Sequence, residues 1–143
     1  MGAATALLYN WSDDRILAAC YDSPFSEFKK LAKELCKKQI NIPSFIIDTA
    51  LMLVRNTIKT KNDLDIFKLT PLIYASKTST PGFFVHAMND ELIPLEHSLD
   101  IVEAYQGEKS LNVCEGNHNT NRQKQIIEKI VRFFCKYLKN EEE

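Results

Sequence analysis

The sequence predicts an α/β fold in which a mostly parallel sheet of about three strands lies between two layers of helices, a three-layer αβα arrangement. Three short apolar runs, at residues 15–21, 82–87 and 110–114, have the continuous hydrophobicity that is typical of strands buried on both faces. The segments between and after these runs place apolar residues at helical spacing. Short buried strands that alternate with helices indicate a parallel sheet covered on both sides.

Length and composition are those of one folded domain, residues 1–143. The net charge of -1 argues against a nucleic-acid-binding protein and against a surface held by anionic lipid. No apolar run approaches the ~20 residues that span a bilayer. The four cysteines are widely spaced, so we expect reduced core residues of a cytoplasmic protein, with no metal site and no cofactor. A disulfide in a secreted protein is the less favoured alternative.

The predicted helices span residues 1–11, 25–35, 45–58, 70–75, 94–105 and 122–139. The last is strongly amphipathic, whereas 45–58 is more apolar than a surface helix needs. Thr70 and Pro71 resemble an N-cap and a first-turn proline, and residues 60–65 a polar loop. We expect segment 40–65 to be a small cap or insertion. Four of its side chains either line an acyl channel or, in the favoured alternative, pack on the sheet: Phe45, Ile46, Leu51 and Met52.

Polar residues follow all three predicted strands at the point where each strand ends. Asp22 ends the first strand, Asn89 and Asp90 follow the second, and His118 follows the third. In a parallel sheet these ends share one edge, and ligands bind beyond that edge. The topology alone therefore predicts that an aspartate and a histidine from adjacent strand ends lie close together.

Three stretches of the chain resemble the α/β-hydrolase family. Residues 1–6 (MGAATA) resemble the end of a G-x-S-x-G nucleophile elbow, with the serine directly before Met1. Residues 65–94 resemble the family's run that ends in H-G-x-x-D-x-x-I-P, with Ala87 in place of the usual glycine. Residues 115–119 (EGNHN) resemble G-x-G-H-N at the catalytic histidine. The subgroup that the stretches resemble most comprises serine aminopeptidases, esterases and protein depalmitoylases.

The resemblance implies the C-terminal part of a serine hydrolase for esters, thioesters or amides, with a truncated sheet that lacks the nucleophile. His118 would take the serine proton, and Asp90 would orient the imidazole. Met1 would donate its amide to the oxyanion hole of the full-length parent, a geometry that an N-terminal residue does not offer, so we expect the isolated chain to be inactive. The substrate would be a small molecule or an acylated protein. Four residues would line it: Asn89, Leu92, Ile93 and Asn119.

Other polar residues fit catalysis less well. Asp22 competes as the acid, although a helix cap before Pro24 is favoured. Ser23 follows a strand but lacks an elbow helix, because Pro24 comes next. His86, on a buried strand, fits a hydrogen-bonded core histidine better than a metal ligand. We expect His97 to lie on an exposed helix face without a role.

A second hypothesis is a non-catalytic interaction module that keeps the hydrolase half-fold. The strand at 15–21 would lack its inner neighbour and present an open apolar edge. We therefore expect self-association, with a homodimer through this edge. A flavodoxin-like domain is a third alternative, weakened by the absence of a glycine-rich loop after the first strand.

Overall fold

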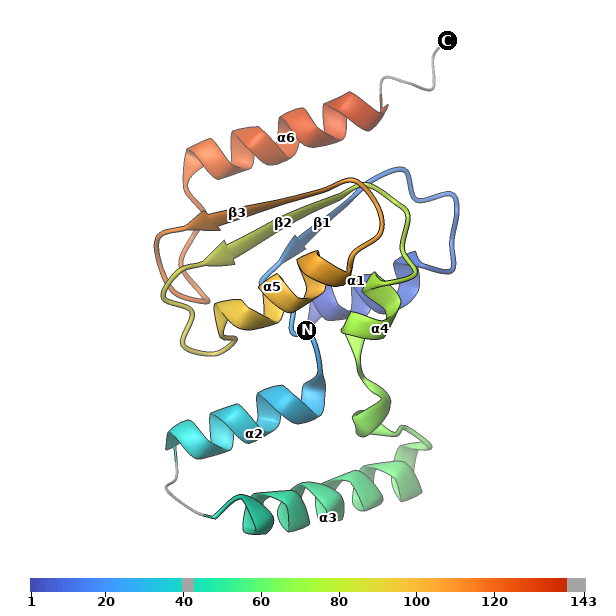
Figure 1. The fold of residues 1–143 in the computed structure, drawn as a ribbon, viewed down its shortest axis with the longest axis vertical. Coiled ribbons are helices and arrows are strands. Elements are labelled where there is room, and N and C mark those ends of the chain that lie inside the picture. The colour runs from blue at the N-terminus through green and yellow to red at the C-terminus, as the bar shows by residue number, and fades with distance from the viewer. Residues whose placement is uncertain (40–42, 139–143) are drawn as a thin grey trace.

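The computed structural model describes residues 1–39 and 43–138 and confirms the α/β fold (Figure 1). Its parallel sheet has the strand order β1-β2-β3. The three strands are Ala19–Asp22, Gly82–Ala87 and Lys109–Cys114. Every residue of β2 is buried, because this strand lies between the other two and under helices on both faces. The chain therefore has three layers, and the carboxyl ends of all three strands meet at one edge.

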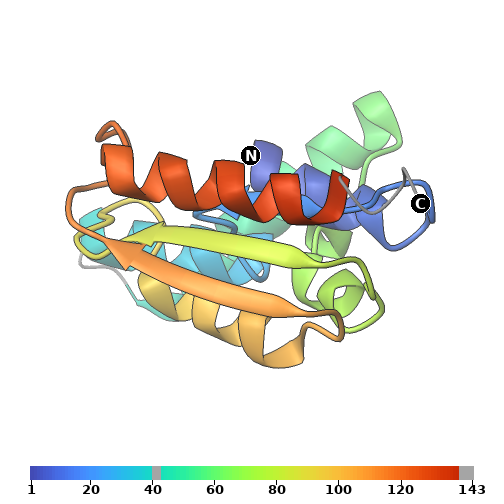
Figure 2. The same ribbon diagram turned by 90° about the horizontal axis from the view of Figure 1, so that it is seen from above.

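Helices cover both faces of the sheet (Figure 2). On one face lies α6 (Lys124–Leu138), whose Ile126 packs with Phe83 of β2. On the other face, Phe84 of β2 packs with side chains of α1 and α5. The helices of this second layer are α1 (Gly2–Asn10), α4 (Pro71–Ala75) and α5 (Leu95–Ala104). Because successive side chains of a strand point to opposite faces, β2 supplies the core on both sides.

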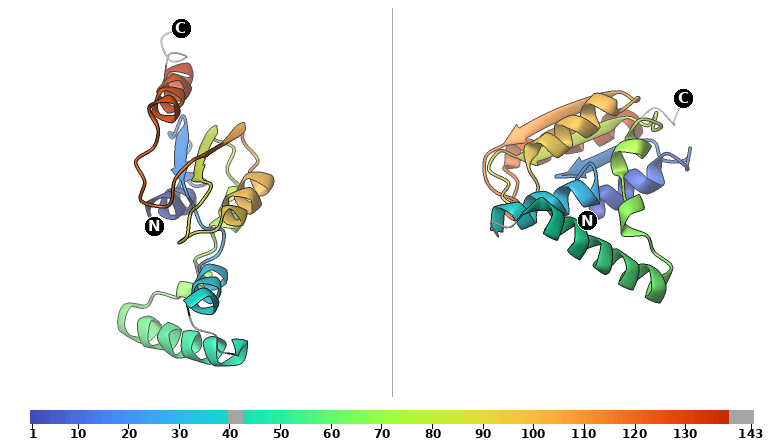
Figure 3. Two further views of the ribbon diagram at one scale, coloured as in Figure 1. Left: turned by 90° about the vertical axis from the view of Figure 1, so that its left-hand side faces the viewer. Right: turned by 60° about the horizontal axis from the view of Figure 1, so that its bottom comes forward.

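Two helices project from this body as a pair (Figure 3). They are α2 (Phe28–Gln39) and α3 (Ser44–Asn62), and a short 3-10 turn, η1 (Ile66–Lys68), leads from them to α4. Leu31 of α2 packs with Phe25, Ala4 and Ile93, whereas α3 mainly contacts α2 and η1 and buries only Ile47. The pair is therefore attached to the body through α2. No helix of the described residues is long and apolar enough to cross a membrane.

The prediction that the apolar residues of α3 pack on the sheet is wrong for Phe45, Ile46 and Met52, whereas Leu51 is half-buried. Their alternative role in an acyl channel stays a prediction. Phe45 is 70% exposed, and Ile46 and Met52 are exposed as well. They do not pack on the sheet, because α2 lies between α3 and the body (Figure 1). The cleft beside His118, described below, is lined by residues of α2 instead. Of the predicted segment 40–65, residues 40–42 lie outside the described residues.

Several predicted boundaries were wrong for local reasons. β1 begins at Ala19 because its pairing with β2 begins there, opposite Gly82, and earlier in the chain the carboxylate of Asp13 holds the backbone and guanidinium of Arg15 in a turn. The segment predicted as a loop at 60–65 is helical up to Asn62, where Asp63 ends α3 in a left-handed conformation with φ 53°. Thr70 makes no side-chain capping bond. The outer strands are also less buried than expected, since each has a strand on one side only among the described residues.

Candidate active site

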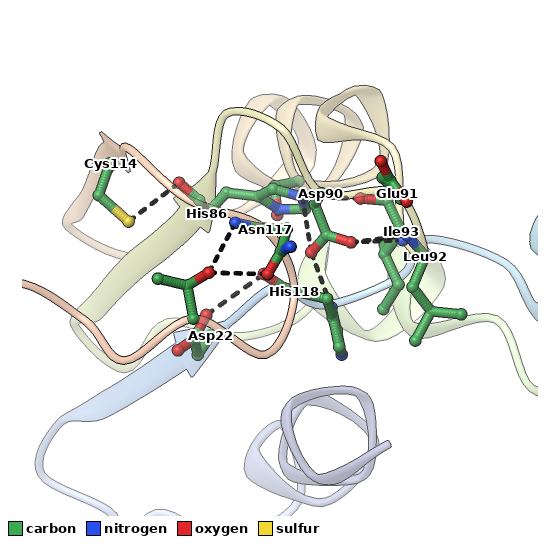
Figure 4. A network of polar contacts seen from close by, with 12 residues as sticks. Asp22, His86, Asp90, Glu91, Leu92, Ile93, Cys114, Asn117 and His118 are labelled. Atoms are coloured by element: carbon green, nitrogen blue, oxygen red, sulfur yellow. Dashed lines mark hydrogen bonds and ion pairs between the residues drawn. The ribbon is translucent and has the colours of Figure 1, made fainter.

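The side chain of Asp90 lies fully buried in the loop after β2. Its Oδ1 accepts the backbone N–H groups of Leu92, at 3.0 Å, and Ile93, at 2.8 Å. Its Oδ2 accepts a hydrogen bond from Nδ1 of His118 at 2.7 Å (Figure 4). Burial opposes ionisation of this carboxyl, but the bonds from Ile93, His118 and Leu92 outweigh it and hold the pKa of Asp90 below its usual value. Asp90 is therefore an oriented, ionised carboxylate.

His118 follows β3, and its side chain is 27% exposed. Because Nδ1 donates to Asp90, Nε2 is the nitrogen that keeps a free lone pair. No described residue makes a hydrogen bond with Nε2. In Figure 4 the imidazole extends from Asp90 toward α1, whose Ala4 packs with Ile93 next to the Asp90 loop. The pair has the geometry of a histidine held as a general base.

His86 lies behind this pair as a fully buried core histidine. Its Nε2 donates to the carbonyl of Ile93 at 2.9 Å, so Nδ1 accepts from the hydroxyl of Ser98 at 2.6 Å. Burial lowers the pKa of His86, which keeps the ring neutral. With both ring nitrogens bonded, His86 supports the loop of Asp90. Nowhere in 1–39 and 43–138 do three or more metal-binding side chains gather in one place.

A cleft of about 380 Å³ lies beside His118. Its lining residues are Leu35, Gln39, Glu91, Leu92, Asn117, His118 and Asn119. Leu92 and Asn119 were expected there, whereas Ile93 is a buried core residue that bonds to Asp90, and Asn89 does not line the cleft. The contribution of α2 was missed, since no sequence pattern shows that this helix approaches the loop of His118. A larger hollow of about 530 Å³ by α1, α3 and η1 contains none of these residues.

Asp22 takes neither role that the sequence suggested. It does not cap a helix or contact His118, because its carboxylate pairs with the guanidinium of Arg122. Ser23 is buried, with φ 47°, and its hydroxyl donates to Asp22 at 3.2 Å. The structure thus places Asp22 and Ser23 under the loop of His118. Arg122, which sequence analysis did not single out, joins them to that loop.

His97 is fully buried, which corrects the expectation of an exposed histidine. Its Nδ1 accepts the backbone N–H of Ser26 at 3.1 Å and lies 2.7 Å from the Ser26 hydroxyl. Nε2 therefore carries the proton and donates to the carboxylate of Glu34 at 2.8 Å. Nearby, Lys30 pairs with Asp100 at 2.7 Å. These contacts join α5 to α2, and periodicity within α5 could not reveal them because the covering helix is distant in sequence.

A family model matches nearly the whole chain. The model for PhoPQ-activated pathogenicity-related proteins aligns with residues 5–143. The chain belongs to this family. YqkD, an uncharacterized protein of Bacillus subtilis, is 28% identical to this PhoPQ-activated pathogenicity-related family member over 121 residues, a match that covers 82% of the chain and 39% of YqkD.

Solved structures of esterases and peptidases share the fold of this PhoPQ-related chain. An acetyl xylan esterase from a Paenibacillus species has a TM-score of 0.67 at 14% identity, over 95% of the chain and 42% of the esterase. The acylaminoacyl peptidase of Pyrococcus horikoshii has a TM-score of 0.67 at 18% identity, over 96% and 23%. An esterase of Pyrococcus furiosus has a TM-score of 0.64 at 16% identity, over 96% and 51%. The fold is therefore that of part of an α/β-hydrolase, and the chain spans about half or less of each relative.

Proposed function

We propose that this chain supplies the acid–base pair of a serine hydrolase that cleaves an ester, thioester or amide. The observation that carries the proposal is the 2.7 Å hydrogen bond between His118 Nδ1 and Asp90 Oδ2, which leaves Nε2 free as a base. The relation of the fold to esterases and peptidases supports it.

In the proposed reaction the chain contributes proton transfer and orientation. Nε2 of His118 takes the proton of a serine hydroxyl as the oxygen attacks the substrate carbonyl, and the imidazolium then gives that proton to the leaving group. A water molecule, deprotonated by the same nitrogen, then attacks the acyl carbonyl, the bond to the serine oxygen breaks, and the imidazolium returns the proton to that oxygen as the acid leaves. Asp90 stays ionised throughout and stabilises the imidazolium, a role that suits its lowered pKa.

The serine of this proposal belongs to a part of the protein outside the 143 residues. The chain spans 39% of YqkD, and within the described ranges no serine hydroxyl bonds to His118. α1 begins at Gly2 close to the site, because Ala4 packs with Ile93. A serine directly before Met1 would lie at this same edge, with the amide of Met1 as a donor to the oxyanion of the tetrahedral intermediate.

The cleft beside His118 is the proposed acyl or leaving-group pocket. Leu35 and Leu92 give it apolar surface, and Gln39, Asn117 and Asn119 bring amide groups that can bond a polar substrate. Because Leu35 and Gln39 belong to α2, the α2–α3 pair serves as the cap. A small molecule or an acylated protein with a short apolar acyl group fits this lining.

A fluorophosphonate probe, which reacts with activated serines, tests the proposal. We expect the 143-residue chain to give no stoichiometric label, and a longer form with a G-x-S-x-G serine before Met1 to react. In that longer form Asp90→Asn should slow labelling by about 10³ to 10⁴, because the histidine is then held in the wrong tautomer.

The matched control is Asp100→Asn, which removes an aspartate that pairs with Lys30 away from His118. It should label at the rate of the parent. Stoichiometric labelling of the 143-residue chain, or equal labelling of the Asp90 and Asp100 variants, would overturn the proposal.

A second candidate function is an interaction module that self-associates. The observation that favours it is the outer edge of β1, which pairs with β2 alone among the described residues. Light scattering tests this candidate: a stable dimer of the 143-residue chain is expected, and a monomer at high concentration would contradict it.

A further inference from the structure

Arg122 is the side chain that organises the loop of His118. Its Nη1 donates to the carbonyls of Asn117, at 3.3 Å, and Thr120, at 3.1 Å. Its Nη2 lies 3.5 Å from the carbonyl of His118 itself. One guanidinium thus gathers three carbonyls of the turn, in which Gly116 has a φ of 113° and would be strained as any other residue.

The same guanidinium is anchored on β1. Its Nε and Nη2 donate to both carboxylate oxygens of Asp22, at 2.8 and 2.7 Å, and Nη2 lies 3.4 Å from the Ser23 hydroxyl. Asp22 is the last residue of β1 and is in register with Val85 of β2. A bidentate pair of this kind fixes orientation as well as distance. The loop of His118 is therefore tied to the strand next to the one that carries Asp90.

We propose that Arg122 and Asp22 form a clamp that positions His118 against Asp90. The contacts form a closed ring. Asp90, in the loop after β2, accepts a hydrogen bond from the imidazole of His118, and Arg122 bonds the backbone of the His118 loop. Arg122 also bonds Asp22 at the end of β1, which pairs with β2. The inference rests on the proposed function in that it takes His118 as the base. Arg122 and Asp22 are positioning residues, since neither contacts the free Nε2.

A second aspartate–arginine pair, Asp13 and Arg15, has the same chemistry but lies outside the loop of His118. Arg15 also makes two bonds to Asp13, at 2.9 and 2.8 Å. The side chain of Arg15 is 86% exposed, and its pair joins residues only two apart in the sequence. The side chain of Arg122 is 12% exposed, and its pair joins two distant elements. Arg15→Gln is therefore a matched control that removes the same chemistry without touching the loop of His118.

The test is the Nδ1–H proton of His118, which resonates far downfield in the NMR spectrum when it is bonded to a carboxylate. We expect Arg122→Gln and Asp22→Asn each to speed its exchange with water about tenfold, the effect of losing one charge-assisted hydrogen-bonded pair. The double variant should be no worse than either single one, because the two residues act as a unit. Arg122→Lys should restore part of the protection, and Arg15→Gln should change nothing.

Each outcome has one meaning. Unchanged exchange in folded Arg122→Gln, or equal effects of Arg122→Gln and Arg15→Gln, overturns the clamp and leaves the acid–base pair intact. Absence of the Nδ1–H signal from the parent chain overturns the pair itself, and with it the proposed function. If Arg122→Gln does not fold, Asp22→Asn and Arg122→Lys decide the question by the same readout.

Discussion

The three histidines occupy three different environments, and their environments predict different responses to mutation. His97→Ala removes a buried ring and leaves the N–H of Ser26 and the carboxylate of Glu34 without their partner. We expect a loss of about 2 to 4 kcal/mol in the free energy of unfolding, measured with urea. His118→Ala takes one bond from the buried carboxylate of Asp90, whose Oδ1 keeps both backbone amides, and should lose less, about 1 to 2 kcal/mol. Equal losses would contradict the structural role assigned to His97.

Gly107 offers a second test at the scale of one residue. A Cβ there would lie 2.4 Å from the carbonyl oxygen of Thr80 and 2.5 Å from that of Ser79, both of which are backbone atoms that cannot rotate away. We expect Gly107→Ala to lower the free energy of unfolding by about 1 to 3 kcal/mol. Gly2→Ala is the control, because a Cβ at Gly2 meets nothing within 4 Å. A thermal melt that does not separate the two variants would show that the Gly107 turn adapts freely.

Among the elements, α3 is held by a pH-sensitive contact. Arg55 of α3 bonds to Asp65, which also accepts the N–H of Phe67 in η1. The Arg55 guanidinium, opposed by burial and helped by the Phe67 amide, lowers the pKa of Asp65 from 3.8 to about 2. Because the pKa of Asp65 is lower in the folded state than in the unfolded state, its ionised carboxylate stabilises the fold at pH values above the unfolded pKa of 3.8. This stabilisation is lost as the pH falls from 3.8 to about 2.

We therefore expect α3 to loosen from η1 in that acidic window, seen as faster amide exchange in α3 than in β2. Asp65→Asn should abolish this acid step and give fast exchange in α3 at neutral pH already. Asp48→Asn, which removes a more exposed partner of Lys33, should have a smaller effect. Acid behaviour of Asp65→Asn identical to that of the parent would contradict this account.

The elements with strong periodicity were those that the sequence predicted well. β2 was predicted at its observed bounds, and α6 within two residues, because continuous or helical hydrophobicity dominates both segments. The start of β1 was missed, since it is set by where the distant strand β2 begins and not by a pattern within residues 15–21. The adjacency of Asp90 and His118 follows from strand ends. The clamp of Arg122 and the lining from α2 do not, because contacts between distant segments leave no local signal.

At the scale of the whole molecule, the open edge of β1 is the feature with the largest consequence. The N–H groups of Ala19 and Ser23 bond to β2, so the N–H of Cys20 between them points to the open side. We expect the chain to dimerise through this edge. Cys20→Pro removes one of the two outward donors, those of Cys20 and Asp22, without loss of a β1–β2 bond, and should give monomers by light scattering.

Cys20→Ala is the control for the lost side chain and should remain dimeric. Burial, with a smaller contribution from Asp22, raises the pKa of the Cys20 thiol to about 11, so the group stays an unreactive thiol. A dimer held by backbone hydrogen bonds and not by a disulfide should therefore persist in a reducing buffer. A parent chain that stays monomeric at high concentration would rule out the edge as an association surface.

The path of the chain through the sheet also sets an order of assembly. β2, α5, β3 and α6 follow one another without interruption from residue 82 to residue 138, whereas β1 reaches β2 only after residues 23–81 have looped out and returned. Short loops close sooner than long ones, so the C-terminal unit should form first and β1 should dock late. Asp90 and His118 both belong to the early unit, and Asp22 belongs to the late strand. On this order the acid and the base meet before Arg122 finds Asp22, and the docking of β1 is the step that fixes their relative position.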